Sequence, residues 1–598
     1  MSDPQDSPHG TPDPVKMAEN MVRIAETSQR LVTEFVTHQA AAGIGMGDPL
    51  NVSGAFIEAM SRMMADPGRV VQAQMQLWQD YMTLWQHTAQ RMMGQPADPV
   101  VQPAPGDRRF RHHEWQENVA FDFIKQSYLL TARWLQATVK EVEGLDEQTA
   151  RKVDFYTRQF VDAMAPTNFV MTNPQVLEAT LESNGENLVH GLENMLRDLD
   201  KESGQLHIRM TDPNAFKVGI DVARTPGQVV FRNELMELIQ YAPMTETVHR
   251  RPLLVVPPWI NKFYILDLRP ENSFIRWANA QGFTTFVISW VNPDEKLAKR
   301  SFEDYMLEGM VAAMDAIEQA TGEREIVTAS LCLGGTLTAA TLAWLAAKGD
   351  DRVKAATYMN TLVDFEEAGD LSVFIDEEQI KALEDRMAAH GGVLDADAMA
   401  TTFNMLRAND LIWSFVINNY LLGKDPFPFD LLFWNSDSTR MPSAMHSFYL
   451  RNMYQKNLLS KPGGITLGGE SIDLGKIKTP SYVLAAREDH IAPWKSSYVA
   501  TQLYGGPVRF VLTGSGHIAG VTNSPEAGKY PHWLNPRRPK DPEAWLKGAK
   551  QHDGSWWINW EKWCASHAGP KVPARQPGDG KLKPIEPAPG RYVKVRAK

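Results

Sequence analysis

A cysteine lies at a point of the chain where it could serve as a nucleophile. Cys332 follows the β-branched run EIVTAS and precedes an alanine-rich segment, so we expect a strand to end and a helix to begin at its thiol. Ser330 and Gly334, two positions before and after it, are small, as a tight strand-to-helix turn requires. The partial positive charge at the start of a helix favours the thiolate, which is the nucleophilic form of cysteine. The turn would also aim the backbone N–H of Leu333 at the position where a substrate oxyanion forms.

Two later loops contain an acid and a base in the order that such a turn predicts. Asp489 lies in AAREDHIAPW, directly after the strand-like run SYVLAA, and His517 lies in TGSGHIAGVTN, after the run VRFVLT. In the α/β-hydrolase architecture the acid and the histidine follow the nucleophile in this order, each in a loop after a late strand. A loop-capping aspartate or a surface histidine would explain either residue alone, but not the ordered set of three. The sequence therefore predicts that Cys332, Asp489 and His517 form a catalytic triad.

Neighbouring residues compete for these roles. His490 is a rival base, but it adjoins Asp489, and adjacent loop side chains usually diverge, so we expect it to support the catalytic residues without contacting the substrate. Glu488 is a rival acid. A second oxyanion N–H is expected near Ile260, in PPWINK. A metal site is not expected, because the pair His112–His113 has no further ligand in helical register and no HExxH or paired-cysteine motif occurs.

The elements that must position the triad occupy the second part of the chain. Up to about residue 210 the patterns are helical, whereas later short apolar runs alternate with helices, which predicts an α/β fold with a parallel sheet covered on both faces. Between about residues 366 and 470 the alternation lapses, and we interpret this segment as a lid (cap) inserted over the site. Trp413 is expected in the apolar wall of the lid, although core packing explains it equally well. The predicted order begins with a disordered N-terminus (1–16) and a helical N-terminal domain (17–210) that contains a linker (94–107). A catalytic domain (211–575) that contains the lid (366–470) follows, and a C-terminal tail (576–598) ends the order.

A helical segment near the N-terminus carries an apolar stripe. Val71, Met75, Trp78, Met82 and Trp85 recur at intervals of four and three, which is one face of a helix with nearly heptad spacing. Packing against a neighbouring helix is the favoured interpretation, and a dedicated partner surface is the alternative.

Composition narrows the class of protein. A chain of 598 residues exceeds what one hydrophobic core can organise, and 43% hydrophobic with 22% charged residues is ordinary for a globular protein. The net charge of −11 disfavours a nucleic-acid binder. Two cysteines cannot form a disulfide framework, which favours a reducing cytoplasm, and we expect neither a secretory signal nor a transmembrane segment.

Several long segments resemble the polyhydroxyalkanoate synthase family. The segment 225–268 (TPGQVVFRNELMELIQYAPMTETVHRRPLLVVPPWINKFYILDL) is similar to that family's entry into its catalytic domain, and LIWSFVINNYLLGKDPFPFDLLFWNSDSTRMP is similar to its lid. REDHIAPW and GSGHIAGVTN resemble its catalytic loops, and GSWWINW and IEPAPGRYVK its C-terminal end. The resemblance runs from about Phe110 to the end of the chain. Ser330 departs from the family's box, which usually opens with glycine, but serine is small enough for the turn.

The resemblance implies an α/β-hydrolase catalytic domain and a class I, single-subunit synthase. Enzymes of that class polymerise short-chain (R)-3-hydroxyacyl-CoA, chiefly 3-hydroxybutyryl-CoA, into polyester with release of CoA, and they use no further cofactor. The family also implies a homodimer in the cytoplasm, at the surface of polyhydroxyalkanoate granules, with phasins as candidate granule-associated partners.

Cysteine suits this chemistry, because moving an acyl group from one thiol to another is nearly isoenergetic and keeps the group activated for ester formation. Asp489 would either orient His517 or help it to deprotonate the 3-hydroxyl of the extending acyl group; the sequence leaves both open. An esterase, thioesterase or polyester depolymerase on the same fold is one alternative function. A non-catalytic granule-binding protein is another.

Overall fold

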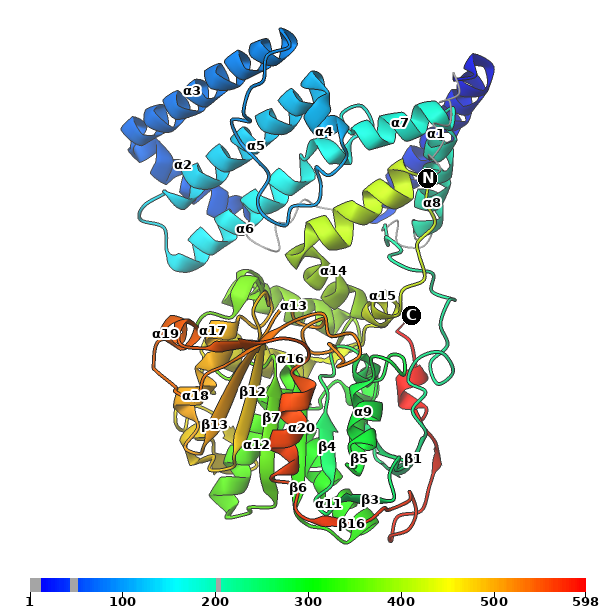
Figure 1. Cartoon of the computed structure of the whole chain (residues 1–598), viewed down its shortest axis with the longest axis vertical. Coiled ribbons are helices and arrows are strands. Elements are labelled where there is room, and N and C mark those ends of the chain that lie inside the picture. Colours follow the sequence, from blue (N-terminus) through cyan, green and yellow to red (C-terminus); the bar gives the residue numbers. More distant parts are fainter. Residues whose placement is uncertain (1–11, 43–51, 200–205, 598) are drawn as a thin grey trace, which may run out of the picture. The chain divides into compact units, whose positions relative to one another are not determined.

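The computed structural model describes residues 12–42, 52–199 and 206–597 of the chain (Figure 1). The chain divides into two compact units. The first comprises the residues up to Asp212 together with Phe403–Pro428, and the second comprises Pro213–Thr402 together with Phe429–Lys598. Each unit is described separately below.

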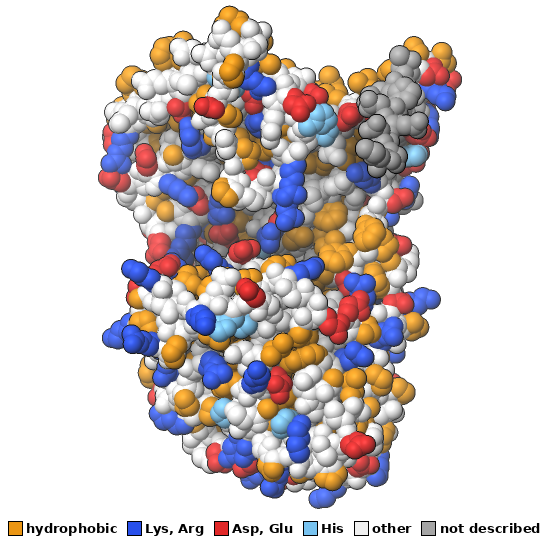
Figure 2. Space-filling view, viewed as in Figure 1, with side chains coloured by type: hydrophobic (Ala, Val, Ile, Leu, Met, Phe, Trp, Pro, Cys, Tyr) orange, Lys and Arg blue, Asp and Glu red, His pale blue; other side chains and the backbone are white. Residues whose placement is uncertain are grey.

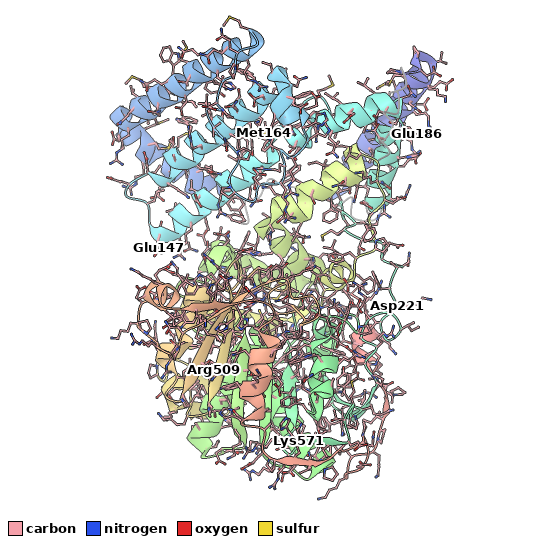
Figure 3. The ribbon with its side chains drawn as sticks, viewed as in Figure 1. Glu147, Met164, Glu186, Asp221, Arg509 and Lys571 are labelled. Atoms are coloured by element: carbon pink, nitrogen blue, oxygen red, sulfur yellow. The ribbon has the colours of Figure 1, made fainter. Side chains whose placement is uncertain are left out.

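Helices make up the first unit. Its helices are α1 (Pro14–Ala42), α2 (Val52–Ala65), α3 (Pro67–Met92), α4 (Glu114–Glu117), α5 (Val119–Lys140), α6 (Glu147–Ala163), the 3₁₀ turn η1 (Pro166–Asn168), α7 (Pro174–Glu182), α8 (Glu186–Asp198) and the π-helical η6 (Asn409–Trp413) and η7 (Val416–Leu421). Figure 3 labels Glu147, where α6 begins, Met164, which directly follows it, and Glu186, where α8 begins.

Side-chain caps explain where several of these helices begin. Helix α1 begins at Pro14, inside the segment expected to be disordered, because Asp13 accepts a hydrogen bond from the N–H of Val15 at 2.9 Å. Residues 1–11 of that segment lie outside the described part of the chain.

The expected linker 94–107 contains no helix or strand, but the buried side chain of Gln126 accepts hydrogen bonds from the N–H groups of Val100 and Val101.

The apolar stripe of α3 is largely exposed, and its contact with a neighbouring helix is made by Trp85, whose ring centroid lies 5.1 Å from that of Phe123 on α5. Its five side chains, from Val71 to Trp85, are all exposed, and that of Trp78 is 65% exposed. The buried residues Leu84 and Thr88 lie on an adjacent face of α3, which packs on α5. In the single chain the favoured interpretation of the stripe is therefore confirmed only at Trp85, and the other four side chains are exposed. Hydrophobic side chains are visible along the top of the first unit, where Figure 1 places α3 (Figure 2).

A mixed sheet forms the centre of the second unit, in the order β15-β14-β13-β12-β7-β6-β4-β5-β2-β1-β17. The six strands from β13 to β5 in that order are parallel, and antiparallel strands extend the sheet on both sides. The strands are β1 (Gly227–Arg232), β2 (Met236–Tyr241), β4 (Leu253–Val256), β5 (Thr285–Trp290), β6 (Ile326–Leu331), β7 (Val353–Met359), β12 (Ser481–Ala486), β13 (Val508–Thr513), β14 (His532–Leu534), β15 (Lys550–His552) and β17 (Glu586–Pro587).

Three short antiparallel strand pairs stand outside the main sheet. They pair β3 (Thr247–His249) with β16 (Lys571–Pro573), β8 (Val393–Leu394) with β9 (Met441–Pro442), and β10 (Thr466–Leu467) with β11 (Glu470–Ser471). Figure 3 labels Lys571, where β16 begins, and Arg509, on β13.

Helices and short helical turns fill the connections between the strands. They are η2 (Phe263–Leu266), α9 (Phe274–Ala280), η3 (Glu295–Leu297), α10 (Phe302–Asp304), η4 (Tyr305–Val311), α11 (Ala312–Thr321), α12 (Leu333–Lys348), η5 (Gly369–Phe374), α13 (Glu377–Ala389), α14 (Ala396–Leu406), α15 (Asp430–Ser436), α16 (Ser443–Tyr449), η8 (Leu450–Gln455), η9 (Leu474–Lys476), α17 (Trp494–Tyr498), α18 (Ala500–Leu503), α19 (Pro542–Lys547), α20 (Trp557–Ala565) and η10 (Tyr592–Lys594).

Apolar layers cover both faces of the sheet. Along β4, Leu253 and Val255 pack in one hydrophobic cluster with residues of α9 and α20, whereas Leu254 and Val256 pack in a second cluster with residues of α11 and α12. Successive side chains of a strand point to opposite faces, so this division places one cluster on each face. The predicted α/β fold with a sheet covered on both sides is confirmed.

The segment expected to form the lid is divided between the units. Residues 403–428 belong to the first unit, because the side-chain amides of Asn187 and Asn194 on α8 donate hydrogen bonds to the carbonyls of Leu421 and Asn419. Trp413 is accordingly half-buried in the first unit. The remaining parts, residues 366–402 and 429–470, belong to the second unit. None of the described helices combines the length and the apolar character of a membrane span.

Candidate active site

Cys332 forms the turn between β6 and α12. Its φ of 51° and ψ of −122° are unusual for a residue with a side chain, so the backbone is strained at the thiol. The N–H of Cys332 donates to the carbonyl of Met359 on β7 at 2.9 Å, which helps to hold this conformation. A Cβ at Gly334 would lie 2.2 Å from the carbonyl oxygen of Val256, so only glycine fits where α12 begins beside the end of β4.

Ser330 fits the turn because its hydroxyl has a partner. The side chain is fully buried on β6 and donates a hydrogen bond to the carbonyl of Thr357 at 2.7 Å. The departure from glycine at this position therefore leaves no unpaired polar group.

Asp489 and His517 meet at the carboxyl ends of β12 and β13. His517 Nδ1 lies 2.6 Å from Asp489 Oδ2, and both side chains are buried. The other carboxylate oxygen accepts hydrogen bonds from the N–H groups of Ile491 and Ala492, at 2.8 and 2.9 Å. The carboxylate is thus fixed on both sides, and its position fixes the orientation of the imidazole ring.

The structure also brings Cys332 to His517. Burial lowers the pKa of His517, but the carboxylate of Asp489 and the sulfur of Cys332 act on it by charge and by side-chain hydrogen bonds, and together they hold the pKa well above its usual value. Asn360, which follows β7, donates from its side chain to the carbonyl of His517 at 2.5 Å and so ties this loop to the sheet. A base that is held by a carboxylate and lies near a thiol can take the thiol proton.

The rival residues lie differently. Glu488 is exposed, whereas Asp489 beside it is buried, so only Asp489 faces His517. His490 is half-buried in the same loop, where its backbone carbonyl approaches Gly369.

Two backbone N–H groups, one next to Cys332 in sequence and one in the loop after the neighbouring strand β4, are candidates for binding an oxyanion. Leu333 is the first residue of α12, and Ile260 lies in the loop after β4, the strand next to β6. Within the part of the chain that the structure describes, neither N–H has a hydrogen-bond acceptor. The close approach of α12 to the end of β4 at Gly334 brings the two loops together.

Sequence reasoning missed two tyrosines near the thiol. Tyr449 ends α16 and Tyr454 lies in η8, both from the expected lid. Burial, and then neighbouring groups that include the Cys332 sulfur, raise the pKa of both phenols well above its usual value. Their rings form an edge-to-face cluster with Phe365. The aromatic content of the segment was visible, but no local pattern distinguishes the tyrosines that reach the thiol.

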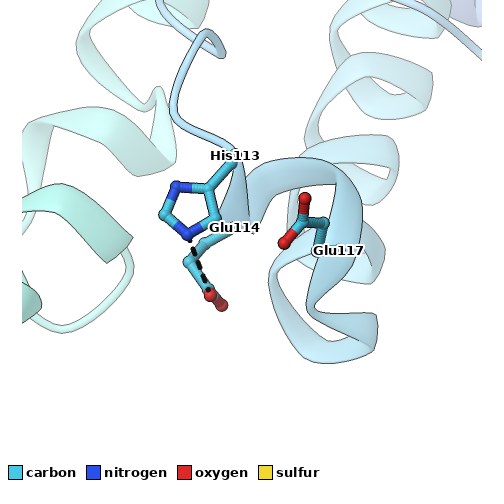
Figure 4. Close-up of side chains that lie close together, drawn as sticks. All are labelled: His113, Glu114 and Glu117. Atoms are coloured by element: carbon cyan, nitrogen blue, oxygen red, sulfur yellow. Dashed lines mark ion pairs between the residues drawn. The ribbon is translucent and has the colours of Figure 1, made fainter. Parts of the chain in front are cut away.

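One group of potential metal ligands occurs among the described residues, and it lies in the first unit. Ligand atoms of His113, Glu114 and Glu117 lie within 4.8 Å of one another (Figure 4). His113 Nε2 is 3.5 Å from Glu114 Oε1, and His112 pairs instead with Glu178 at 2.9 Å. His113 and Glu117 are exposed, and such acidic groups are common without a metal.

Comparison with known proteins extends over the whole chain. A family model described as the N-terminus of poly-beta-hydroxybutyrate polymerase (PhaC) matches residues 106–278, and a model of the alpha/beta hydrolase fold matches residues 259–524. The chain is 51% identical over 598 residues to the poly(3-hydroxyalkanoate) polymerase of Methylorubrum extorquens, covering 98% of each chain.

Two further relatives match at similar length. The identity is 47% over 593 residues to the poly(3-hydroxyalkanoate) polymerase subunit PhaC of Rhizobium meliloti (strain 1021), covering 99% of this chain and 97% of that one. It is 41% over 571 residues to the subunit PhaC of Cupriavidus necator, covering 94% and 93%. Because these matches span nearly the full length of each protein, the chain belongs to the poly(3-hydroxyalkanoate) polymerase family, as its motifs predicted.

Proposed function

We propose that this chain is a class I poly(3-hydroxyalkanoate) polymerase that transfers short-chain (R)-3-hydroxyacyl groups, chiefly 3-hydroxybutyryl, from coenzyme A to a growing polyester. The observation that carries the proposal is the 2.6 Å contact between His517 and Asp489 at the carboxyl edge of the sheet, with the Cys332 sulfur near enough to act on the imidazole. Family membership supports the polymerisation, and the choice of sulfur supports transfer over hydrolysis.

In the first half of the reaction His517 accepts the thiol proton, and the Cys332 thiolate attacks the thioester carbonyl. The oxyanion that forms is stabilised by the N–H groups of Leu333 and Ile260. When the tetrahedral intermediate collapses, the bond to coenzyme A breaks, and the departing thiolate takes the proton from His517. The product is an acyl thioester on Cys332.

In the second half the 3-hydroxyl of an acyl group attacks the thioester on Cys332. His517 accepts the hydroxyl proton, an ester bond forms, and the sulfur leaves as a thiolate that recovers the proton. Asp489 is proposed to orient His517 rather than to remove this proton itself, because both carboxylate oxygens already accept hydrogen bonds. The chemistry requires no metal or cofactor.

The test compares Cys332→Ala with the unaltered protein on 3-hydroxybutyryl-CoA, following CoA release and polymer together. We expect no CoA release from the variant, because the acyl acceptor is missing. Persistent turnover would exclude Cys332 as the nucleophile. Release of free 3-hydroxybutyrate by the unaltered protein, without polymer, would favour a thioesterase, and the absence of any CoA release would favour a non-catalytic granule-binding protein.

Substrate range and assembly are part of the same proposal. A homodimer in the cytoplasm, at the surface of polyester granules and in contact with phasins, is supported by the family resemblance. Rates measured with acyl chains of increasing length test the short-chain preference, and sedimentation of the purified protein tests the dimer.

A further inference from the structure

The ammonium group of Lys262 is buried close to the proposed site, and the mechanism above does not use it. Lys262 Nζ donates to the carbonyls of Val593 and Val595, both at 2.7 Å, and lies 3.3 Å from Asp437 Oδ1. The hydroxyl of Tyr264 donates to the other oxygen of Asp437 at 2.9 Å. An ammonium group has three donors, and here it has three oxygen partners, which is what makes a buried charge tolerable.

Lys262 thereby holds the C-terminal tail through the carbonyls of Val593 and Val595. The tail is also held just before these carbonyls, where the buried carboxylate of Glu237 accepts hydrogen bonds from the N–H groups of Arg591 and Tyr592. The single turn η10 is therefore fixed by a carboxylate at its N–H end and by the ammonium of Lys262 at its carbonyl end.

The loop that contains Lys262 is the loop that contains Ile260. Several of its carbonyls accept hydrogen bonds from side chains. Trp290 Nε1 donates to the carbonyl of Pro257 at 2.9 Å, the hydroxyl of Thr439 donates to that of Ile260 at 2.8 Å, and Trp434 Nε1 donates to that of Lys262 at 2.7 Å. The N–H of Ile260 is left without an acceptor among the described residues.

We propose that Lys262 is a positioning residue for the oxyanion site: by binding the carbonyls of Val593 and Val595 it makes the C-terminal tail a brace that fixes the loop 257–262 and the free N–H of Ile260. The proposal rests on the function proposed above. It assigns to the last residues of the chain a part in acyl transfer, although they carry no reacting group. A stabilising donor acts only if it is already in place when the charge develops, so loss of the brace should slow acylation.

The experiment separates two reactions of the same sulfur. Acylation of Cys332 is followed by the burst of p-nitrophenol from p-nitrophenyl butyrate and by CoA release from 3-hydroxybutyryl-CoA. Alkylation by iodoacetamide forms no oxyanion and reports only on the thiolate, its base and access to the site. The variants are Lys262→Met combined with Asp437→Asn, which removes both charges together, and a chain that ends at Gly590. Lys594→Met is the matched control, because Lys594 is an exposed lysine of the same tail.

We expect both variants to lower the rate of acylation and kcat by about tenfold or more, with KM and the rate of alkylation within about twofold of the unaltered protein, and Lys594→Met to change neither. Unchanged acylation in alkylation-competent variants would overturn the proposal. A parallel fall of acylation and alkylation would also overturn it, because the tail would then support the fold as a whole. The truncated chain leaves the pair of Lys262 and Asp437 intact and so decides the matter if the double variant does not fold. If the unaltered protein releases no CoA, the proposed function fails, while the p-nitrophenyl butyrate burst still tests the brace.

Discussion

The charge state of the imidazole is the central feature at the scale of single residues. The buried His517 lies between two groups that favour its protonated form, Asp489 and Cys332, and these outweigh the effect of burial on its pKa. The position of His517 between Asp489 and Cys332 explains why His490 cannot replace His517. It also explains why the exposed Glu488 cannot replace Asp489.

Asp489→Asn should lower the pKa of His517, because it removes the first of the influences that raise it. NMR titration of the His517 ring should show a proton retained well above pH 6.5 in the unaltered protein and lost at lower pH in the variant. The linked effect on stability has a defined sign. Because the pKa of His517 is raised in the folded state, its protonation adds stability that is complete below pH 6.5 and is lost as pH rises through the folded pKa. The difference in the free energy of unfolding between the unaltered protein and the variant should therefore shrink with rising pH.

Glu488→Gln is the control, since it removes the adjacent, exposed carboxylate. It should leave both the titration and the pH dependence of unfolding unchanged. Equal effects of the two substitutions would mean that general charge near the loop, and not the contact between Asp489 and His517, sets the pKa.

At the scale of elements, the strand–turn–helix at Cys332 depends on how closely α12 approaches the end of β4. Gly334→Ala would place a Cβ 2.2 Å from a backbone oxygen of Val256, an atom that cannot move aside cheaply. We expect the free energy of unfolding to fall by roughly 1–3 kcal/mol and acylation of Cys332 to slow, because the two oxyanion donors lie on the two elements forced apart. Denaturant unfolding and the p-nitrophenyl butyrate burst measure the two effects.

Gly68→Ala provides the comparison. Gly68 lies in the first turn of α3, and a Cβ there would have only an ordinary contact at 3.5 Å. Alanine should be neutral or should stabilise by about 0.5–1 kcal/mol, as expected for glycine replaced in a helix. A similar loss of stability in both variants would contradict the argument from close approach.

Local sequence predicted the parts of the site that are set by local geometry. A small-residue turn between a strand and a helix marks Cys332, and loops after late strands mark Asp489 and His517; the structure brings these three together. Contacts between distant segments could not be predicted in this way. Lys262 meets carbonyls more than 300 residues away, and Tyr449, from an inserted segment, lies near enough to the Cys332 sulfur to be affected by its charge.

The stripe of α3 shows what a local pattern could not predict about packing. A heptad-like pattern predicts that one face of a helix is apolar, but not that another helix covers it. In this chain α3 uses a neighbouring face, with Leu84 at its centre, for packing on α5, and Trp78 remains exposed. Periodicity therefore identified the helix correctly, but of the predicted face only Trp85 contacts α5.

At the scale of the whole molecule, the first unit is built from two separate stretches of the chain. Residues 403–428 complete it although they are inserted in the sequence of the second unit. The buried hydroxyl of Tyr420 donates to Asp198 at 2.7 Å, and the carbonyls of Asn419 and Leu421 accept from asparagines of α8. The inserted stretch therefore depends on the N-terminal helices for its polar partners.

This dependence predicts how a shortened chain behaves. A protein that begins at Pro213 keeps residues 403–428 but loses α8, so Tyr420 and the carbonyls of Asn419 and Leu421 lose their partners and apolar surface becomes exposed. We expect it to aggregate more and to melt at a lower temperature than a matched chain in which residues 403–428 are replaced by a flexible Gly/Ser linker. Sedimentation and thermal unfolding of the two proteins measure the difference. Equal behaviour would mean that the inserted stretch is held by the second unit, which would remove the basis for assigning Trp413 to the first.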